Sequence, residues 1–446
     1  MRDCLEFYRE RDLRTTEYMQ NQDLEVLPVH VGIDAKAAGD PPAQLALLAL
    51  SNQLARVHRR ITFNLPSSPI ALRVPVRFAR PTLDETLLSI CSKIDPYGDF
   101  RIGLPHAGPL VSIGLGNNPS GQYDWYLGAD QAIAHLSRSP VAFSSKAGTI
   151  RGAALASCLG SAALFRSMVG LETIPRSVSA WNYGEGNEAS LGPESLATLD
   201  VGRVLMVGAG AVAASLVYWL NAFGVRGTWT VVDRDLVQVH NLNRGLIFVA
   251  TDAGWPEGKP NAKAELLTSW LPNGRHDCAW YHESKLVEEH YDVILGLAND
   301  HSVRHYIASR NSTLTLHATT GSNWLSQLHR HIAGVDDCIW CRAGEIATPS
   351  FKCSTGNVEL PTGTKTDAAL PFLSAASGLM LATALQRLEC GELAEQNRND
   401  WRWDFGSTYK MAGSGFRQCR FDCKRVLALD IRRRLDSTNR WLELGK

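Results

Sequence analysis

An excess of charge of either sign is missing from this sequence of 446 residues. Lys and Arg number 45 and Asp and Glu number 45, so the formal net charge is +0. Without a basic excess, no overall field recruits nucleic acid or an anionic membrane, and any anionic ligand must be held by a local site. Repeats and low-complexity tracts are also missing. With 45% hydrophobic and 20% charged residues, a disordered or collagen-like chain is excluded.

Long apolar runs are missing as well. The N-terminal stretch MRDCLEFYRERDLR is charged from its second residue, which excludes a secretory signal peptide. The two most apolar stretches, residues 153–170 and 370–388, are interrupted by Ser, Cys or Arg, so we expect buried helices rather than membrane spans. We therefore expect a cytoplasmic protein with no membrane and no nucleic-acid partner. In that compartment the ten cysteines are expected to be thiols or metal ligands rather than disulfides.

A segment rich in Gly, Ser, Asn and Pro, residues 175–192, is expected to connect two halves. We expect one domain over residues 1–190 and a second over 191–446. The first half predicts strand, helix and strand, at residues 29–33, 41–60 and 61–65. This βαβ pattern is typical of a parallel sheet, yet the turn IDAKAAGD after the first strand has no glycine pair that would admit a pyrophosphate. The first half is expected to have a nucleotide-binding fold without its nucleotide site.

The second half contains a glycine-rich turn in a strand–turn–helix–strand context. The predicted segments are a strand at 203–207, the turn at 208–213, a helix to about 223 and a strand at 228–232. Gly208 makes the tight turn, Gly210 lets phosphate approach the backbone, and Ala213 allows close helix packing. Asp233 ends the second strand at the spacing of an acid that binds ribose hydroxyls. This set predicts a dinucleotide or nucleotide site rather than an empty packing turn.

Basic residues follow the ribose acid. Asn241 and Arg244 stand in the run Asn-Leu-Asn-Arg, and Lys259 or Lys263 precedes the next helix. A dehydrogenase has no need of cations at this position, whereas nucleotidyl transfer needs them to neutralise the β- and γ-phosphates. Turn residues and solvated lysines are the structural alternative.

In these motifs the sequence resembles the ThiF/MoeB family of adenylyltransferases, which includes the ubiquitin-activating enzymes. The resemblance covers about residues 201–389 and leaves the choice between the two lysines open. It implies an α/β fold: a Rossmann-like doubly wound sheet with a ThiF-type adenylation domain, preceded by a degenerate, inactive copy. The chain would then be a monomeric pseudo-dimer, with a homodimer as the alternative. The residues that the resemblance assigns to ATP binding are Gly208, Gly210, Ala213, Asp233, Asp235, Asn241, Arg244, Lys259 and Lys263.

The family holds Mg²⁺ with an acid in the pattern Asp-Asn followed by Arg. Here the order is reversed, as Asn299 and Asp300 before Arg304. We predict that Asp300 still holds the Mg²⁺, because this ion prefers carboxylate and phosphate oxygens. The alternative is that Asp300 caps the helix that starts near Ser302.

Two cysteine pairs match the places where relatives in the family hold a structural zinc. Tetrahedral Zn²⁺ takes four thiolate ligands, and closely spaced pairs can each occupy one edge of the tetrahedron. Two ordinary buried thiol pairs are the alternative. The predicted Zn²⁺ ligands are Cys338, Cys341, Cys419 and Cys423.

Cys353 lies in a polar, glycine-containing loop that resembles the family's crossover loop. Neighbouring Lys352 would lower the pKa of its thiol, so we predict that Cys353 carries an acyl group, with loop packing as the alternative. Arg11 or Arg14 is a candidate for the N-terminal arginine that relatives send into a neighbouring ATP site; a solvated charged helix is the alternative. The cysteines expected to serve only in packing are Cys4, Cys91, Cys158, Cys278 and Cys390.

The activity that the resemblance implies is ATP-dependent adenylation of the C-terminal glycine of a ubiquitin-like protein. The acyl group would pass to Cys353 as a thioester and then to a conjugating enzyme. Three rivals stay open: activation of a sulfur-carrier protein with a C-terminal Gly, adenylation of a peptide or small acid, and a scaffold that binds nucleotide without turnover. The predicted cofactors are ATP, Mg²⁺ and Zn²⁺, and the catalytic residues would be Cys353, Arg244, Lys259 and Asp300.

Overall fold

A computed structural model gives the fold. The residues that it describes are 3–12, 27–72, 76–194, 200–308, 314–321, 324–332, 336–337, 356–359, 365–368, 370–390, 392 and 399–406.

The first half forms a seven-stranded sheet in the order β3-β2-β1-β4-β5-β6-β7. Strands β3 to β5 in that order are parallel, and β6 and β7 continue the sheet in antiparallel fashion. All residues of β1 are buried, as expected for a parallel strand covered on both faces. The strands are β1 (Val29–Ile33), β2 (Arg60–Asn64), β3 (Asp99–Ile102), β4 (Val111–Leu115), β5 (Trp125–Asp130), β6 (Ile133–Ser137) and β7 (Arg176–Ser179).

The second half repeats this topology. Its seven strands have the order β10-β9-β8-β11-β12-β13-β16. The first five are again parallel and the last two antiparallel. When the strands of each sheet are numbered from the first strand of its half, both sheets have the order 3-2-1-4-5-6-7. The fold is therefore α/β and Rossmann-like in both halves. The strands are β8 (Asp200–Val207), β9 (Arg226–Val232), β10 (Gly274–Asp277), β11 (Val293–Gly296), β12 (Leu314–Gly321), β13 (Leu325–Ile332) and β16 (Asp400–Asp404).

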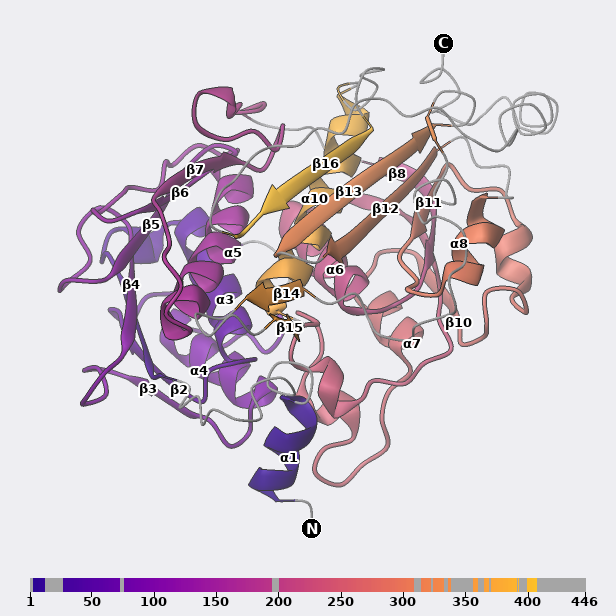
Figure 1. Ribbon diagram of the computed structural model, residues 1–446. Helices are drawn as coiled ribbons and strands as arrows, with labels where there is room; N and C mark the ends of the chain where they lie inside the picture. Colours follow the sequence, from indigo (N-terminus) through magenta and orange to yellow (C-terminus); the bar gives the residue numbers. More distant parts are fainter. Residues whose placement is uncertain are drawn as a thin grey trace.

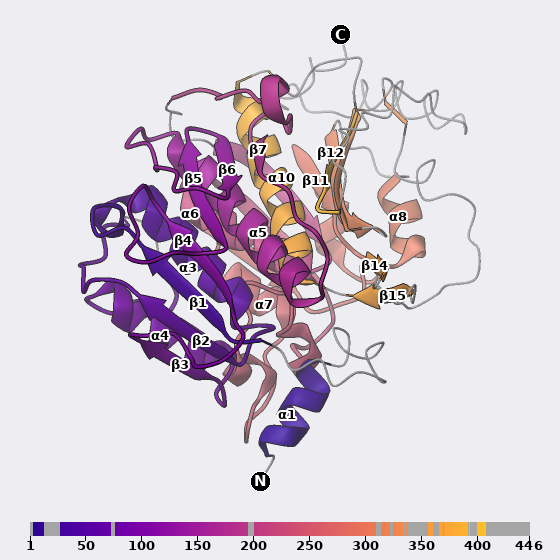
Figure 2. The same ribbon diagram turned by 60° about the vertical axis from the view of Figure 1, so that its left-hand side comes forward.

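Four long helices lie between the two sheets (Figures 1 and 2). Helix α3 packs on α5, α6 packs on α10, and α5 and α10 pack on each other. Because they are covered from both sides, these helices carry apolar and small residues around the whole circumference. They are α3 (Pro41–Leu54), α5 (Thr149–Met168), α6 (Ala211–Phe223) and α10 (Pro371–Glu389).

Glycines allow the closest contacts in this layer. A Cβ atom on Gly160 of α5 would lie 2.7 Å from Leu127 Cδ1 on β5, and one on Gly378 of α10 would lie 2.6 Å from the Leu216 nitrogen on α6. A larger residue at either position would force the packed elements apart. The small residues of these helices therefore set how closely helix meets sheet and helix meets helix.

The remaining elements lie around this core. Helix α1 contacts the short helix η3 of the second half, and β14 pairs with β15 in an antiparallel hairpin. No helix in the described ranges is long and apolar enough to cross a membrane. These elements are α1 (Cys4–Arg11), α4 (Leu83–Ile94), α7 (Lys263–Thr268), α8 (His301–Ala308), β14 (Gly356–Glu359), β15 (Lys365–Ala368), and the 3-10 helices η1 (Ala37–Gly39), η2 (Gly186–Glu188), η3 (Val239–Asn241), η4 (Ala250–Ala253) and η5 (Lys285–Glu288).

The predicted strands and helices are present, with two differences. The helix expected over residues 41–60 ends at Leu54, because the chain turns back there to begin β2 at Arg60. Residues 175–192 are not a simple connector. They contain β7, which pairs with β6, and the side chains of Trp181 and Tyr183 are buried. Gly and Pro in this segment mark the ends of an edge strand rather than a linker.

Candidate functional site

The glycine turn follows β8 at the carboxyl edge of the second sheet. Gly208 has φ +97, and a Cβ atom there would lie 2.6 Å from the Ala298 nitrogen, so the turn itself requires glycine. At Gly210, by contrast, a Cβ would meet no heavy atom within 4 Å among the described residues. The open space above Gly210 belongs to a cavity, so its glycine leaves room for a ligand. Ala213 is buried under the turn and packs the helix, as the sequence predicted.

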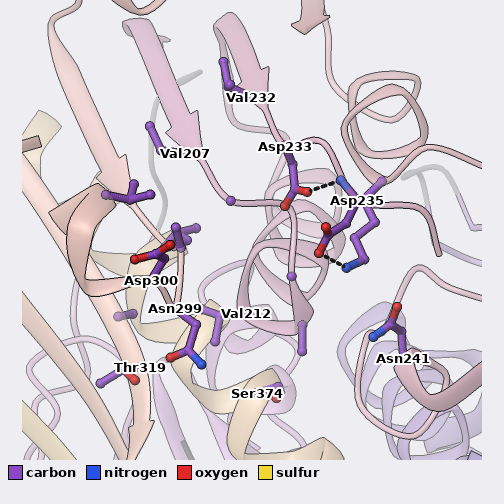
Figure 3. Close-up of a pocket in the computed structure, with 18 of the residues that line it drawn as sticks. Val207, Val212, Val232, Asp233, Asp235, Asn241, Asn299, Asp300, Thr319 and Ser374 are labelled. Atoms are coloured by element: carbon purple, nitrogen blue, oxygen red, sulfur yellow. Dashed lines mark hydrogen bonds and ion pairs between the residues drawn. The ribbon is translucent and has the colours of Figure 1, made fainter. Parts of the chain in front are cut away.

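Asp233 joins the end of β9 to the glycine turn. Its Oδ2 accepts a hydrogen bond from the Ala209 nitrogen at 2.6 Å. Its Oδ1 accepts one from the Asp235 nitrogen at 2.7 Å (Figure 3). Burial raises the pKa of the Asp233 carboxyl above 3.8, and the ammonium of Lys263 opposes that shift. Each carboxylate oxygen keeps a second lone pair for a donor in the cavity.

Lys263, and not Lys259, reaches this cavity. Lys263 is the first residue of α7 and is 8% exposed, and its Nζ lies 3.0 Å from Asp235 Oδ2 (Figure 3). Its backbone N–H also donates to the Asp235 carbonyl at 2.9 Å. Lys259 is exposed in the loop before α7 and does not line the cavity. Of the two lysines between which the sequence left the choice open, Lys263 lines the cavity and Lys259 does not.

Asn241 is the last residue of η3, and Arg244 follows it in a stretch of buried residues. Asn241 Oδ1 accepts a hydrogen bond from the Gln238 nitrogen at 3.0 Å, which fixes its side chain at the cavity wall (Figure 3). Arg244 is 9% exposed and lines the same cavity. A cation and an amide thus line the cavity together with the glycine turn.

Asn299 and Asp300 follow β11 on the other side (Figure 3). Asp300 Oδ1 accepts hydrogen bonds from the Ser302 nitrogen at 2.8 Å and from Ser302 Oγ at 2.7 Å, so it caps α8. Its Oδ2 makes no hydrogen bond or ion pair within the described part of the chain. A carboxylate that lines a cavity and has one oxygen without a hydrogen bond fits a hard divalent cation.

The end of β12 supplies a wall that the sequence did not predict. His317, Thr319 and Thr320 line the cavity there. Burial, with Arg304 and His329 nearby, holds the pKa of His317 well below 6.5, so this imidazole is neutral at neutral pH. The signal that sequence analysis overlooked is positional: these residues end a parallel strand at the edge where the glycine turn lies.

Together these groups enclose a cavity of about 380 Å³, which is within the range of small-molecule sites. After β10, Trp280 closes one side, and the guanidinium of Arg234 stacks on its ring at 3.4 Å from the centroid. Of the predicted ATP-binding residues, Lys259 stays outside and Ala213 lies beneath the wall. Those that line the cavity are Gly208, Gly210, Asp233, Asp235, Asn241, Arg244 and Lys263, together with Asp300.

The corresponding edge of the first sheet is filled by the protein's own side chains. The carboxylate of Asp34, after β1, accepts hydrogen bonds from the backbone nitrogens of Lys36 at 2.8 Å and Asn118 at 2.9 Å. A Cβ atom on Gly32 would lie 1.8 Å from Tyr123 Oη, so the Tyr123 ring lies against the strand. The backbone donors that a phosphate would need are therefore already taken.

Arg11 does not reach the cavity. Its guanidinium is fully buried in ion pairs with Asp12 and Asp95, each at 2.6 Å, so it is neither the donated arginine nor a solvated charge. Arg14, the other candidate, lies outside the described residues.

The cysteines divide by exposure. Cys91 and Cys158 are buried, as expected for packing residues, and burial raises the pKa of the Cys158 thiol to about 12. Cys278 and Cys390 are exposed, so the expectation that they only pack is wrong for both. Cys278 follows β10 directly, next to Ala279 of the cavity wall.

The predicted zinc and acyl-carrying cysteines lie outside the described residues. In the ranges that the structure covers, no group of three or more His, Cys, Asp or Glu is placed to hold a metal ion. The four zinc ligands and the acyl carrier therefore stay predictions: Cys338, Cys341, Cys419, Cys423 and Cys353.

Residues 186–403, which hold the cavity, match the ThiF family. This C-terminal region is a ThiF family domain.

Individual relatives match more weakly. An uncharacterized protein of Sinorhizobium fredii, y4jF, is 27% identical over 259 residues, which are 56% of this chain and 46% of that protein. The SAMP-activating enzyme E1 of Haloferax volcanii is 39% identical over 72 residues, 16% of this chain and 26% of the enzyme. The chain thus matches half or less of the length of these relatives. A crystal structure of Escherichia coli MccB with MccA-N7isoASN has 13% identity and a TM-score of 0.37, covering 49% of this chain and 65% of MccB.

Proposed function

We propose that this chain is an adenylyltransferase that activates the C-terminal glycine carboxylate of a ubiquitin-like protein. A carboxylate oxygen attacks the α-phosphorus of ATP, the bond between the α-phosphorus and the bridging oxygen breaks, and pyrophosphate leaves. The thiolate of Cys353 then attacks the acyl carbon of the adenylate and displaces AMP, and the thiol proton passes to solvent. A conjugating enzyme would receive the acyl group from this thioester.

One observation carries the adenylation step: Arg244 and Lys263 are among the cationic side chains that line the cavity with the acid Asp233. A site for dinucleotide redox chemistry needs the glycine turn and the acid, but it does not need cations where the triphosphate of ATP would extend. Positioned cations stabilise the charge that develops on a leaving pyrophosphate. The ThiF match over residues 186–403 and the similarity to an enzyme named for SAMP activation support the same chemistry.

The strand order supports a specific arrangement of the substrates along the cavity walls. Along the carboxyl edge the strands run β9, β8, β11, β12. Ribose would bind Asp233 after β9, and the α-phosphate would lie over Gly210 after β8, at the N-terminus of α6. The acyl substrate would then enter from β12, where Thr319 and Thr320 line the cavity.

Mg²⁺ would be held by Asp300 and by phosphate oxygens, since one carboxylate oxygen of Asp300 is left over from the helix cap. When bound, Mg²⁺ neutralises phosphate charge and orients the triphosphate for in-line attack. Arg244 and Lys263 would share this charge from the opposite wall.

The test of adenylation is exchange of radiolabelled pyrophosphate into ATP, measured with a small ubiquitin-like protein that ends in glycine. Arg244→Ala should reduce the exchange rate by at least about 100-fold, since removing a preorganised charge partner from a transition state has effects of this size. An exchange rate near that of the wild type in a folded Arg244→Ala variant would contradict the adenylation proposal.

The thioester step has its own test. Cys353→Ala should keep pyrophosphate exchange and lose the thiol-sensitive conjugate on a non-reducing gel. Cys278→Ala is the matched control: Cys278 is exposed beside the cavity, but partial desolvation and the negative charge of Glu265 raise the pKa of its thiol, which lowers the fraction of thiolate. A conjugate lost only in Cys278→Ala would move the relay to that residue. Exchange with no conjugate in the wild type would favour activation of a sulfur carrier or a peptide.

A further inference from the structure

The buried loop that carries Arg244 depends on the first half of the chain for its hydrogen bonds. Residues 241–250 are all buried, and most of this stretch has no regular secondary structure. Buried backbone carbonyls need donors, and a loop without helix or strand pairing cannot supply enough of its own. The donors come from α3 and the two residues after it, and from Arg77, all of which belong to the first half.

Arg56 makes most of these contacts. Its Nη1 donates to the Leu242 carbonyl at 2.6 Å and to the Phe248 carbonyl at 3.1 Å, and its Nη2 donates to the Leu246 carbonyl at 2.9 Å. One planar guanidinium thus joins both ends and the middle of the loop that contains Arg244. The planar guanidinium holds its N–H donors in fixed directions and can therefore reach three carbonyls at once, whereas the ammonium of a lysine cannot hold its donors in this arrangement.

Two neighbours complete the arrangement. Asn52 Oδ1 accepts from Arg56 Nε at 3.0 Å, and its Nδ2 donates to the Leu246 carbonyl at 3.1 Å. Arg77 donates to the Ile247 carbonyl and pairs with both carboxylate oxygens of Asp252, at 2.7 and 2.8 Å. The loop is therefore fastened at four carbonyls and at the acid that follows it.

The chemistry of Arg56 argues for a specific role. It is fully buried, and within the described ranges it forms no ion pair. Burial lowers its pKa, which is the mark of a charge placed where desolvation disfavours it. The Arg56 guanidinium donates hydrogen bonds to three carbonyls of one loop. These contacts are those expected of a residue that positions that loop.

We propose that the first half of the chain is the positioning part of the ATP site. Arg56, with Asn52 and Arg77, holds the loop so that Arg244 faces the β- and γ-phosphates. This role rests on the proposed function. In it, the first half of the chain, which has no nucleotide site of its own, contributes to the reaction by positioning Arg244. Arg56 does not touch the nucleotide; it acts through Arg244.

The experiment compares binding of Mg-ATP and of AMP by titration calorimetry. Arg56→Gln should weaken ATP binding by about tenfold or more, the effect of losing one charge-assisted contact, while AMP affinity changes less than about twofold. Only ATP extends to Arg244, whereas a general loss of folding lowers the fraction of binding-competent protein without changing the ratio of the two affinities. Arg56→Lys should fall between wild type and Arg56→Gln.

Arg166→Gln is the matched control. Arg166 is also a buried arginine of the first half that donates to backbone carbonyls, and one of these is Phe405 of the second half. Arg166 lies far from the Arg244 loop in the sequence, and the carbonyls to which it donates lie outside that loop. Its substitution should therefore leave the affinities for ATP and for AMP within about twofold of wild type. An equal loss of ATP affinity in the two variants would overturn the proposal.

A double variant provides the decisive measurement. If Arg56 acts through Arg244, then Arg56→Gln should cost less than about twofold in ATP affinity when Arg244 is already alanine. An undiminished tenfold loss in that background, or equal weakening of AMP and ATP, would overturn the inference. Should Arg56→Gln fail to fold, Asn52→Ala removes one carbonyl donor and should weaken ATP selectively by about threefold.

The outcome is separable from that of the proposed function. A wild-type protein that binds ATP but shows no pyrophosphate exchange would refute adenylation, and the ratio of ATP to AMP affinity would still test the loop. A wild-type protein that binds no ATP would refute both.

Discussion

Replacing Lys263 tests the placement of the cavity's second cation. Lys263→Met keeps the aliphatic stem that α7 buries and removes the ammonium. The ion pair with Asp235 is half exposed on the aspartate side, so its loss should change the free energy of unfolding by no more than about 1 kcal/mol. The chemistry should respond more strongly, because an ammonium–phosphate contact contributes about 1.5–3 kcal/mol.

That energy corresponds to a loss of about 10- to 150-fold in kcat/KM for pyrophosphate exchange. Lys259→Met is the matched control, because Lys259 is an exposed lysine only four residues away and should leave exchange within about twofold of wild type. Equal effects of the two substitutions, or a Lys263→Met enzyme within twofold of wild type, would refute the assignment.

The pH dependence gives a second signature of the same change. Asp233 must be ionised to accept ribose hydroxyls, so ATP affinity is present above its folded pKa and is lost as the pH falls through that value. The Lys263 ammonium lowers this pKa against the larger effect of burial. Without the ammonium the pKa rises further, so ATP binding in Lys263→Met should fail at a higher pH than in wild type. Lys259→Met should leave the acid limb of the titration curve unmoved.

Four further predictions concern single features of the site. Because burial raises the pKa of Asp233, its contribution to stability is present below the ordinary 3.8 and is lost as the pH rises through the folded value; the free energy of unfolding of wild type should therefore fall relative to that of Asp233→Asn across that window. Asp300→Asn retains a helix cap but should raise the Mg²⁺ concentration needed for exchange, and an unchanged requirement would leave Asp300 as a cap only. Calorimetry should find about one ATP per chain, because Asp34 and Tyr123 fill the first edge; two would contradict this. Elemental analysis should find about one zinc per chain if the four predicted cysteines bind it, and less than roughly a tenth in protein never exposed to chelator would exclude the site.

Several features of the site could be predicted from the sequence because they depend on short-range geometry. The glycine turn, the helix after it and the acid at the end of β9 lie within about thirty residues, and their strand–turn–helix–strand order follows from local hydrophobic pattern. Gly208 is required by its positive φ, and Asp233 bonds back to the turn that precedes its strand. A motif whose parts fold against one another can be recognised without the rest of the protein.

Other features depend on contacts between segments far apart in the chain. Lys259 and Lys263 look alike in sequence, and only the path of the loop before α7 decides which one reaches the cavity. Arg56 follows a long helix in a half without a nucleotide turn, and its partners lie nearly two hundred residues away. Local pattern carries no information about such partners, because it reports which face of an element is buried and not what buries it. By itself the sequence determined the nucleotide turn and the resemblance to the ThiF family; the tertiary structure decided which lysine lines the cavity and which side chains of the first half contact the loop that carries Arg244.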